Sequence, residues 1–470
     1  MTKMKVALIP IDNRPVCYSL PRKISQIDSD IEFFLPEKSD MGNLKKPANI
    51  ENLLTWLKQI GEVDALIIAL DTIAYGGLIP SRRSRDTLDQ IKERLEKFKN
   101  IVSEKTQLYA FSSIMRISNN NINEEEKPYW NVYGKKIYEY SYQFHEELTD
   151  KTDVPKDIIN DYLATRKRNF EVNKIYERWF EEGFFNTLIF SKDDCAPYGF
   201  NVMEADILER KLRNKCKNGK CALIKTGADE IPLSLFARAI VDFNIKCGKE
   251  APKIQVKYTA PEYKHLISNY EDISVEQCVN GQISIANCKI APNNSSTDMV
   301  LLVNNFEEIQ GEHVMGIDTK KYSGELVLPE KIFMVADVRF ANGADRRFAD
   351  KLLKQKLGNN FYGYSAWNTT ANTVGSLLCT ALVRYFATDY NAKTFFTIPF
   401  IRFLDDWAYQ SIVRQIFKKQ VSKPNLRALK RLILPYEKRL KKLFSIEKEI
   451  KYSFPWKRFF EIEILFRSKV

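Results

Sequence analysis

The chain has 470 residues, of which 44% are hydrophobic and 28% charged, so it is long enough for a full hydrophobic core and has the composition of a folded protein. No apolar run approaches the roughly 18 residues that a membrane span needs, and the opening MTKMKVALIPID lacks the long apolar stretch of a signal peptide, so we expect a cytoplasmic protein without a membrane span. Three histidines and eight scattered cysteines without a C-x-x-C pair argue against a Ser-His-Asp triad and a zinc site, and predict reduced thiols.

From residue 5 to about 370, short apolar runs alternate with longer charged stretches of helical pattern, which is typical of a mostly parallel sheet covered by helices. In chain order, the predicted strands are 5–11, 31–36, 64–70, 108–114, 186–190, 221–226, 253–258, 299–303, 332–338 and 362–367. The predicted helices between them include 50–60, 87–102 and 161–183. We therefore expect an α/β fold, and favour a (β/α)8-like barrel over an open doubly wound sheet.

The domain organisation is predicted to be an α/β core over residues 1–410, with a helical insertion at about 119–180 and a basic helical segment at 411–470. This last segment contains 17 Lys/Arg and 5 Asp/Glu, so it carries the whole net charge of +12. Its leucines recur at helical spacing among the basic residues, which predicts amphipathic helices interrupted by Pro435. We expect this face to meet solvent or an acidic partner, and not nucleic acid, because no nucleic-acid-binding motif accompanies it.

Polar residues follow seven of the predicted strands at the point where each strand ends. Each stretch alone is an ordinary turn signal, but the carboxyl ends of parallel strands converge, so seven together predict one shared site. The candidate substrate-binding residues are Asp12, Arg14, Asp71, Tyr75, Arg82, Arg116, Asp229, Glu230, Asp337, Asn342, Asp345, Trp367, Asn368 and Asn372.

The best candidates for catalysis are Asp193 and Asp194, which lie in SKDDCAPYGF directly after the apolar run NTLIF. Neighbouring carboxyl groups at a strand end can be given different pKa values, as glycoside hydrolysis requires. The alternative is structural, with one aspartate capping the next helix and the other solvated.

Other motifs also have two interpretations. Asp229 and Glu230 either bind substrate hydroxyls or a metal, or are acids in the first turn of a helix. Arg82 follows two glycines and is suited to a phosphate or carboxylate clamp, but neither a P-loop nor G-x-G-x-x-G is present, so no nucleotide cofactor is expected. Trp367 and Asn368 either stack on and hydrogen-bond a sugar, or are a core tryptophan and a helix cap.

The stretches IPIDNRP, LDTIAYGGLIPSRR, IMRIS, SKDDCAPYG, GADE, FANGAD, AWNTTANT and FPWKRFFEIEI occur in this order. Together they resemble a bacterial family, domain-of-unknown-function family 4127, over nearly the whole chain. The resemblance implies no particular activity, so function is argued from the chemistry of the residues.

At the level of the site, the chain is similar to retaining β-N-acetylhexosaminidases of the O-GlcNAcase and hyaluronidase-like type, which are (β/α)8 barrels. The similarity rests on the Asp-Asp pair and on WNTTAN. It implies that Asp193 polarises the 2-acetamido group of the substrate, that Asp194 is the general acid/base, and that Asn368 holds a hydroxyl or the acetamido carbonyl. The chain departs from these enzymes because it lacks their glycine-rich first strand end.

We therefore expect a hydrolase that cleaves a small carbohydrate through Asp193 and Asp194, without a cofactor or a metal. One alternative is a Mg²⁺- or Mn²⁺-assisted hydrolase or isomerase, for which the candidate ligands are Asp12, Asp71, Asp194, Asp229 and Asp337. The other alternative is a non-catalytic carbohydrate- or anion-binding protein that uses the same strand-end residues.

Overall fold

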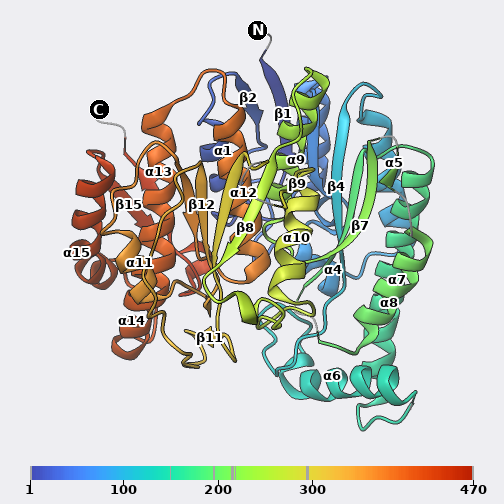
Figure 1. The fold of residues 1–470 in the computed structure, drawn as a ribbon. Coiled ribbons are helices and arrows are strands. Elements are labelled where there is room, and N and C mark those ends of the chain that lie inside the picture. The colour runs from blue at the N-terminus through green and yellow to red at the C-terminus, as the bar shows by residue number, and fades with distance from the viewer. Residues whose placement is uncertain are drawn as a thin grey trace. The chain divides into compact units, whose positions relative to one another are not determined.

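The computed structural model describes residues 3–148, 150–193, 196–212, 216–217, 219–292 and 296–467. The chain divides into two compact units, which are described separately (Figure 1). Unit 1 comprises Met1–Tyr18, Ile31–Leu235 and Tyr270–Asp272, and unit 2 comprises Ser19–Asp30, Phe236–Asn269 and Ile273–Val470.

Unit 1 is built on a seven-stranded sheet with the order β2-β1-β3-β4-β5-β7-β6. All neighbours pair in parallel except β6, which pairs antiparallel with β7. The interior strand β3 is buried along its whole length, as expected for a parallel sheet covered on both faces. The strands are β1 (Met4–Ile9), β2 (Ile31–Phe34), β3 (Ala65–Ala69), β4 (Gln107–Ile114), β5 (Thr187–Lys192), β6 (Cys216–Lys217) and β7 (Lys220–Thr226).

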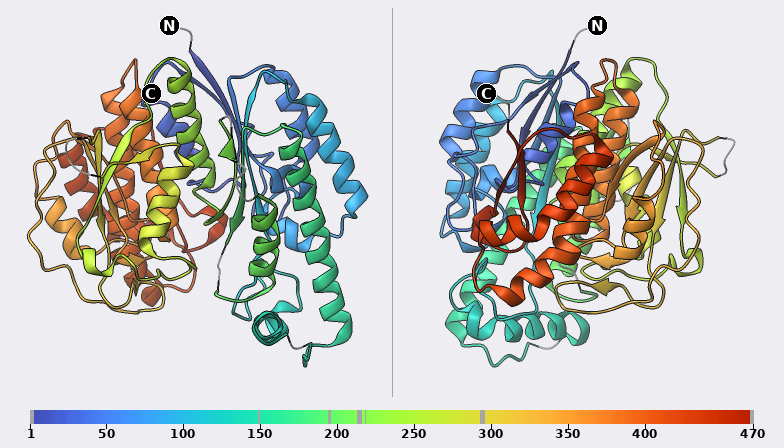
Figure 2. Two further views of the ribbon diagram at one scale, coloured as in Figure 1. Left: turned by 45° about the vertical axis from the view of Figure 1, so that its right-hand side comes forward. Right: turned by 90° about the vertical axis from the view of Figure 1, so that its left-hand side faces the viewer.

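Two helices of unit 1 begin at side-chain caps. The Asn49 side chain accepts from a backbone N–H at the start of α2, and Thr87 forms a capping box at the start of α5. In the left view of Figure 2 the sheet is seen nearly edge-on, with α5 and α7 on one side. The helices are α2 (Ile50–Ile60), α3 (Leu70–Tyr75), α4 (Leu78–Arg83), α5 (Leu88–Ile101), α6 (Trp130–Glu147), α7 (Lys156–Glu181), α8 (Phe200–Leu212) and α9 (Ile231–Lys246), of which α9 continues into unit 2.

A small second core stabilises the helical segment between β4 and β5. Trp130 and Tyr140 on α6, Tyr162 on α7 and Phe200 on α8 are buried together in this cluster. The indole of Trp130 and the ring of Tyr162 lie 5.9 Å apart between centroids, within the range of favourable aromatic contacts. These contacts fix the long connection that carries part of the candidate site described below.

Unit 2 is built on a five-stranded, wholly parallel sheet with the order β14-β12-β10-β8-β9. Its strands are β8 (Lys253–Tyr258), β9 (Lys289–Ile290), β10 (Met299–Asn304), β12 (Phe333–Asp337) and β14 (Phe361–Ser365). When the strands of each sheet are numbered in chain order, both sheets contain the order 2-1-3-4-5. This is one of the two common orders of open doubly wound sheets. The predicted α/β class with mostly parallel sheets is confirmed. Barrel closure would also require the end strands of a sheet to pair, and the described strands show no such pair, so the barrel stays a prediction.

The remaining elements of unit 2 are mostly helical. Two short sheets accompany them, one of β11 (Gly311–Glu312) with β13 (Phe340–Ala341) and one of β15 (Ile450–Ser453) with β16 (Glu463–Phe466). The helices are α1 (Ser19–Ser25), α10 (Val275–Ile285), α11 (Arg346–Leu352), α12 (Thr370–Phe386), α13 (Ala392–Arg402), a π-helix (Phe403–Val413), α14 (Arg414–Gln420), α15 (Leu426–Phe444) and the 3₁₀ turns Pro261–Tyr263 and Pro455–Lys457.

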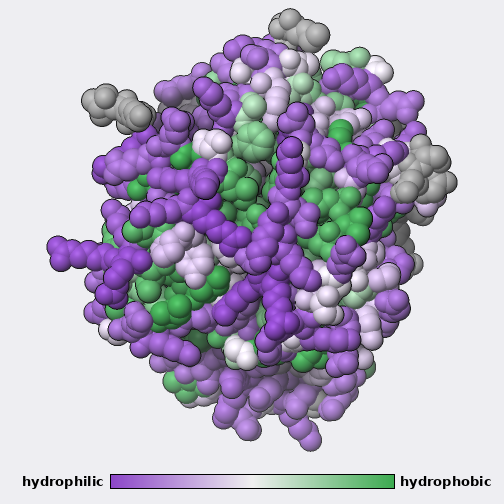
Figure 3. All heavy atoms as spheres, turned by 60° about the vertical axis from the view of Figure 1, so that its left-hand side comes forward, coloured by the Kyte–Doolittle hydropathy of each residue, from purple (hydrophilic) through white to green (hydrophobic). Residues whose placement is uncertain are grey.

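The basic C-terminal segment contains one continuous helix, α15, and not helices interrupted by Pro435. A proline inside a helix costs roughly 3 kcal/mol, but here apolar residues on both sides of it, Ile433 and Leu440 among them, are buried in the core of unit 2. This packing holds the parts of α15 before and after Pro435 in one continuous helix. The exposed face carries basic residues, including Lys430 and Lys438, and Figure 3, which turns the side of α15 forward, shows a mostly hydrophilic surface. An acidic partner for this face stays a prediction.

The ten predicted strands and the three predicted helices are confirmed. The expectation of reduced thiols is wrong for Cys216 and Cys221, which form a disulfide because the β6–β7 hairpin places them opposite each other. Among the described residues, none of the helices has both the length and the apolar character needed to cross a membrane.

Candidate functional site

The carboxyl edge of the unit 1 sheet gathers the strand-end residues of five strands. In a sheet of this order, the chain leaves β1 toward β2 on one side and leaves β3 toward β4 on the other side. Ligands of such proteins bind at the strand ends between these two connections. Asp12 follows β1 and Asp71 follows β3, so both lie at this point. Arg116, Asp193 and Asp229 follow β4, β5 and β7 along the same edge.

Arg14 joins the loops after β1 and β7. Its Nε donates to Asp12 Oδ2 at 2.8 Å, and its Nη1 and Nη2 donate to the two carboxylate oxygens of Asp229 at 2.9 and 2.5 Å. Strands β1 and β7 are four positions apart, or about 19 Å at the usual strand spacing of roughly 4.8 Å. The loops after β1 and β7, together with the Arg14 side chain, therefore bridge this distance.

The carboxyl group of Asp229 combines burial with several nearby charges. Burial raises its pKa, the guanidinium of Arg14 lowers it, and the charges of Asp12 and Asp193 raise it again, with a net upward shift. Its side chain is still 14% exposed. A partly accessible acid whose pKa is raised by burial and by specific charged neighbours is a candidate functional group.

The loop that carries Asp229 depends on Gly227. This glycine has φ +105°, a conformation that L side chains rarely adopt. A Cβ at this position would lie 2.0 Å from Oε1 of Glu230. Glu230 itself is fully buried directly before α9, so in this structure it supports the loop and does not face a ligand.

Asp193 lies directly after β5, which is the neighbour of β7 in the sheet. Its Oδ2 accepts from Nη1 of Arg116 at 3.1 Å, and Nη2 of Arg116 donates to Glu125 at 2.7 Å. The side chain of Asp193 is 21% exposed. The other member of the predicted catalytic pair, Asp194, lies outside the described residues.

Asp71 and Tyr75 lie deeper than Asp193 and Asp229. Asp71 is 2% exposed, and its Oδ2 accepts from the backbone N–H of Ser113 at 2.8 Å. Burial raises the pKa of Asp71 to about 6, although the Ser113 hydrogen bonds and the charge of Arg82 lower it. Tyr75 is buried beneath the guanidinium of Arg168, 5.4 Å from its ring centroid. Both residues therefore support the site from below.

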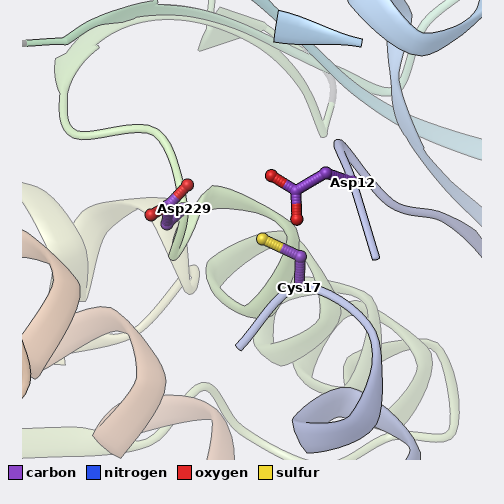
Figure 4. Close-up of side chains that lie close together, drawn as sticks. All are labelled: Asp12, Cys17 and Asp229. Atoms are coloured by element: carbon purple, nitrogen blue, oxygen red, sulfur yellow. The ribbon is translucent and has the colours of Figure 1, made fainter. Parts of the chain in front are cut away.

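A metal centre was the alternative interpretation of these carboxylates. Ligand atoms of Asp12, Cys17 and Asp229 lie within 4.8 Å of one another, and Figure 4 shows the three side chains close together. The guanidinium of Arg14 already provides the positive charge between the two carboxylates through four contacts. A divalent cation would have to displace this guanidinium, so in this conformation the cluster does not fit a metal.

The other predicted strand-end residues belong to the sheet of unit 2, where they form a buried network. Asp337 at the end of β12 accepts from Asn304 at 2.8 Å, from the N–H of Asp345 at 2.9 Å and from the hydroxyl of Tyr364 at 3.2 Å. Burial and the charge of Asp345 raise the pKa of Asp337 well above its usual value. Asp345 also caps α11. These contacts hold β12, β14 and α11 together.

Three asparagines of unit 2 form a chain of amide hydrogen bonds. Asn368 donates to Asn342 at 2.9 Å and accepts from Asn372 at 2.8 Å. Asn342 and Asn368 have φ of +57° and +59°, a conformation that asparagine tolerates better than most residues. Trp367 is 2% exposed, so in this structure its ring packs in the core and offers no face to a sugar.

Two cavities lie beside these clusters. One cavity of about 330 Å³ in unit 1 is lined by Tyr75, Pro80 and Arg83, among others. A second, of about 670 Å³ in unit 2, is lined by residues that include Glu312 and Arg346. Asp193 and Asp229, the acids that follow β5 and β7, line neither of these two cavities.

Sequence reasoning missed three acids that belong to the unit 1 site. Glu125 and Glu126 form ion pairs with Arg82 and Arg116. Asp272 accepts from the hydroxyl of Thr226 at 2.6 Å and forms an ion pair with Lys192, the last residue of β5. The run EEE in a polar loop was a visible signal for the two glutamates. Asp272 is brought to the edge of the sheet only by tertiary structure.

The strand order and the paired acids and arginines define the class: a parallel α/β protein with a polar site at the strand ends. The family described as "Protein of unknown function (DUF4127)" matches residues 6–465. The chain belongs to this family. No curated protein and no solved structure matches the chain.

Proposed function

We propose that unit 1 carries the active site of a carbohydrate-active hydrolase, with Asp229 and Asp193 as its two carboxyl groups. The observation that supports this proposal most is the raised pKa of the partly exposed Asp229, next to a second partly exposed acid on the neighbouring strand. Hydrolysis of a glycosidic bond requires one protonated and one ionised carboxyl group on either side of the scissile bond.

In this proposal Asp229 is the general acid. It donates its proton to the glycosidic oxygen as the bond to the anomeric carbon breaks, and a water molecule later supplies the hydroxyl that the sugar retains. Asp193, held by Arg116, assists on the other side, as nucleophile, as base or by orienting a substrate group. Arg14 orients Asp229 through its bidentate contact.

A finer form of the proposal is a retaining β-N-acetylhexosaminidase. Here Asp193 polarises the 2-acetamido group, which attacks the anomeric carbon, and either Asp194 or Asp229 is the general acid/base. The proposal does not depend on a closed barrel, because strand-end loops also converge at the carboxyl edge of an open parallel sheet.

The test is hydrolysis of a panel of fluorogenic glycosides, including β-GlcNAc and β-GalNAc, by the full chain. We expect Asp229→Asn and Asp193→Asn each to reduce turnover by about 10²-fold or more. Asp64→Asn is a suitable control, since this exposed aspartate precedes β3, away from the carboxyl edge, and its side chain accepts from the backbone N–H of Lys5. Turnover that is retained in both site variants would remove the proposal, and loss in Asp194→Asn alone would move the general acid to that residue.

A metal-assisted hydrolase or isomerase is the second candidate, because ligand atoms of Asp12, Cys17 and Asp229 lie close together, although the cation would have to displace Arg14. For this candidate, activity should disappear with EDTA and return with Mg²⁺ or Mn²⁺. Because the guanidinium of Arg14 competes for the same carboxylates, Arg14→Gln should then bind the cation more tightly. Activity that is unaffected by EDTA would exclude the metal-assisted enzyme. Saturable binding of a sugar without formation of a product would instead favour a non-catalytic binding protein.

A further inference from the structure

Two arginines and two glutamates form a compact charged cluster beside Asp193. Arg82 lies in the last turn of α4, Arg116 follows β4, and Glu125 and Glu126 lie in the loop that leads to α6. Nη2 of Arg116 lies 2.7 Å from Glu125, and Nη1 of Arg82 lies 3.2 Å from Glu126. Nη2 of Arg82 is 3.5 Å from Glu125, so each glutamate contacts both arginines.

Arg82 is poorly satisfied in this arrangement. Its side chain is 1% exposed, and within the described part of the chain none of its three guanidinium nitrogens makes a hydrogen bond of acceptable geometry. Oε1 of Glu126 also lacks a hydrogen bond there. By contrast, the nearby Arg168 donates to three backbone carbonyls. A buried polar group without an aligned partner destabilises the folded chain, so its presence requires an explanation.

We propose that Arg82 and Arg116 form a subsite for a ligand carboxylate, which Glu125 and Glu126 occupy as internal substitutes. The guanidinium groups present a fork of N–H donors that matches a planar carboxylate. Glutamate carboxylates lie against this fork, but the loop does not align them with Arg82. A ligand carboxylate is free to adopt the aligned geometry.

The accessible side of the subsite is the one that faces Asp193. Arg116, Asp193 and Glu125 are 16%, 21% and 23% exposed, whereas Arg82 is buried behind them. A ligand can therefore reach Arg116 by displacing Glu125. Asp193 lies 3.1 Å from Arg116, and its charge opposes a doubly charged phosphate more than a singly charged carboxylate. The geometry therefore favours a carboxylate.

This inference rests on the proposed function, which it makes more specific: the substrate is an acidic sugar, such as a hexuronate. A sugar carboxylate bound by Arg116 places the rest of the ring next to Asp193, the proposed catalytic group. The subsite thus accounts for two arginines that a neutral sugar would not require.

The test is calorimetric titration of the full chain with D-glucuronate, D-glucose and glucose 6-phosphate. We expect D-glucuronate to bind at least about tenfold more tightly than D-glucose, and also more tightly than glucose 6-phosphate. Arg116→Gln should abolish this preference. Glu125→Gln should tighten D-glucuronate binding, because it removes the competing carboxylate, and a variant that merely folds poorly would not gain affinity. Arg178→Gln, at an exposed position on α7, is the matched control and should behave as the unmodified chain.

Equal binding of D-glucuronate and D-glucose, tighter binding of the phosphate ester, or no gain in Glu125→Gln would overturn the inference. These outcomes are separate from those of the hydrolase test. Hydrolysis of neutral glycosides without a preference for D-glucuronate would keep the hydrolase and remove the acidic subsite. Binding of D-glucuronate without hydrolysis of any glucuronide would keep the subsite and remove the hydrolase.

Discussion

Asp71 offers a quantitative test of the electrostatics beneath the site. Its pKa is raised from 3.8 to about 6 because the carboxyl group is buried beside the end of β3. The folded chain therefore binds this proton more tightly than the unfolded chain does. Stability contributed by Asp71 is fully present below pH 3.8, decreases as the pH rises from there, and is lost above about pH 6.

The size of this effect follows from the shift. At 1.36 kcal/mol per pKa unit, the full loss is about 3 kcal/mol, of which about 2 kcal/mol falls between about pH 4.5 and about pH 7.5. Asp71→Asn cannot ionise and keeps an acceptor for the N–H of Ser113. Any cost of burying the amide is independent of pH. We therefore expect the stability of Asp71→Asn relative to the unmodified chain to increase by about 2 kcal/mol over that interval.

Hydrogen exchange of peptides from β3 and β4 is the appropriate assay, because it reports the stability of unit 1 separately from that of unit 2. Asp64→Asn is the control, since Asp64 also accepts a backbone hydrogen bond but is exposed, so no desolvation is relieved. A stability difference between Asp71→Asn and the unmodified chain that does not change with pH would refute the reasoning.

Three further substitutions test individual contacts. Asp345→Ala removes the side chain that accepts from two amides of α11, and should reduce stability by about 1–2 kcal/mol, measured as faster hydrogen exchange in that helix. Gly227→Ala forces a Cβ against Glu230 at φ +105°, and should reduce stability by about 1–3 kcal/mol and lower turnover, measured by thermal unfolding and the glycoside assay. Arg14→Gln removes the charge that lowers the pKa of Asp229, so that pKa should rise further, as followed by NMR titration of the carboxyl carbon.

Each of these substitutions has a control. Asp345→Asn retains a capping oxygen and should recover most of the lost stability. Gly219→Ala has φ +79° but would meet nothing within 4 Å, so it measures backbone strain without the clash. Arg22→Gln removes an equal charge from α1 and should leave the titration of Asp229 unchanged. An equal effect of variant and control would contradict the corresponding contact.

The strands were predictable because their signal is local. Runs such as KIQVKY and MVLLV are short, rich in β-formers and bounded by polar residues, and they coincide with β8 and β10. Strands β6 and β9 have two residues each and carry no such pattern. The division into two sheets was not predictable either, since a strand of one sheet has the same local pattern as a strand of the other.

For the site, the sequence predicts which residues follow strands but not how deep they lie. Asp193 and Asp71 both follow apolar runs, yet one is partly exposed and the other is buried against Ser113. Trp367 shows the same limit, because an indole at a strand end is compatible with a sugar platform and with a core residue. Depth is set by the helices and loops that cover each strand end, which are distant in the sequence.

The arginines, more than the number of aspartates, determine what the unit 1 site can do. Arg14 neutralises two carboxylates at once, which leaves little affinity for a divalent cation in this conformation. Yet the pKa of Asp229 is still raised, since burial and two neighbouring acids outweigh the guanidinium. The site therefore combines a carboxyl group with a raised pKa, Asp229, and a second carboxyl group, Asp193, which is paired with Arg116. Acid–base chemistry on an uncharged bond requires these two features, whereas binding alone requires neither.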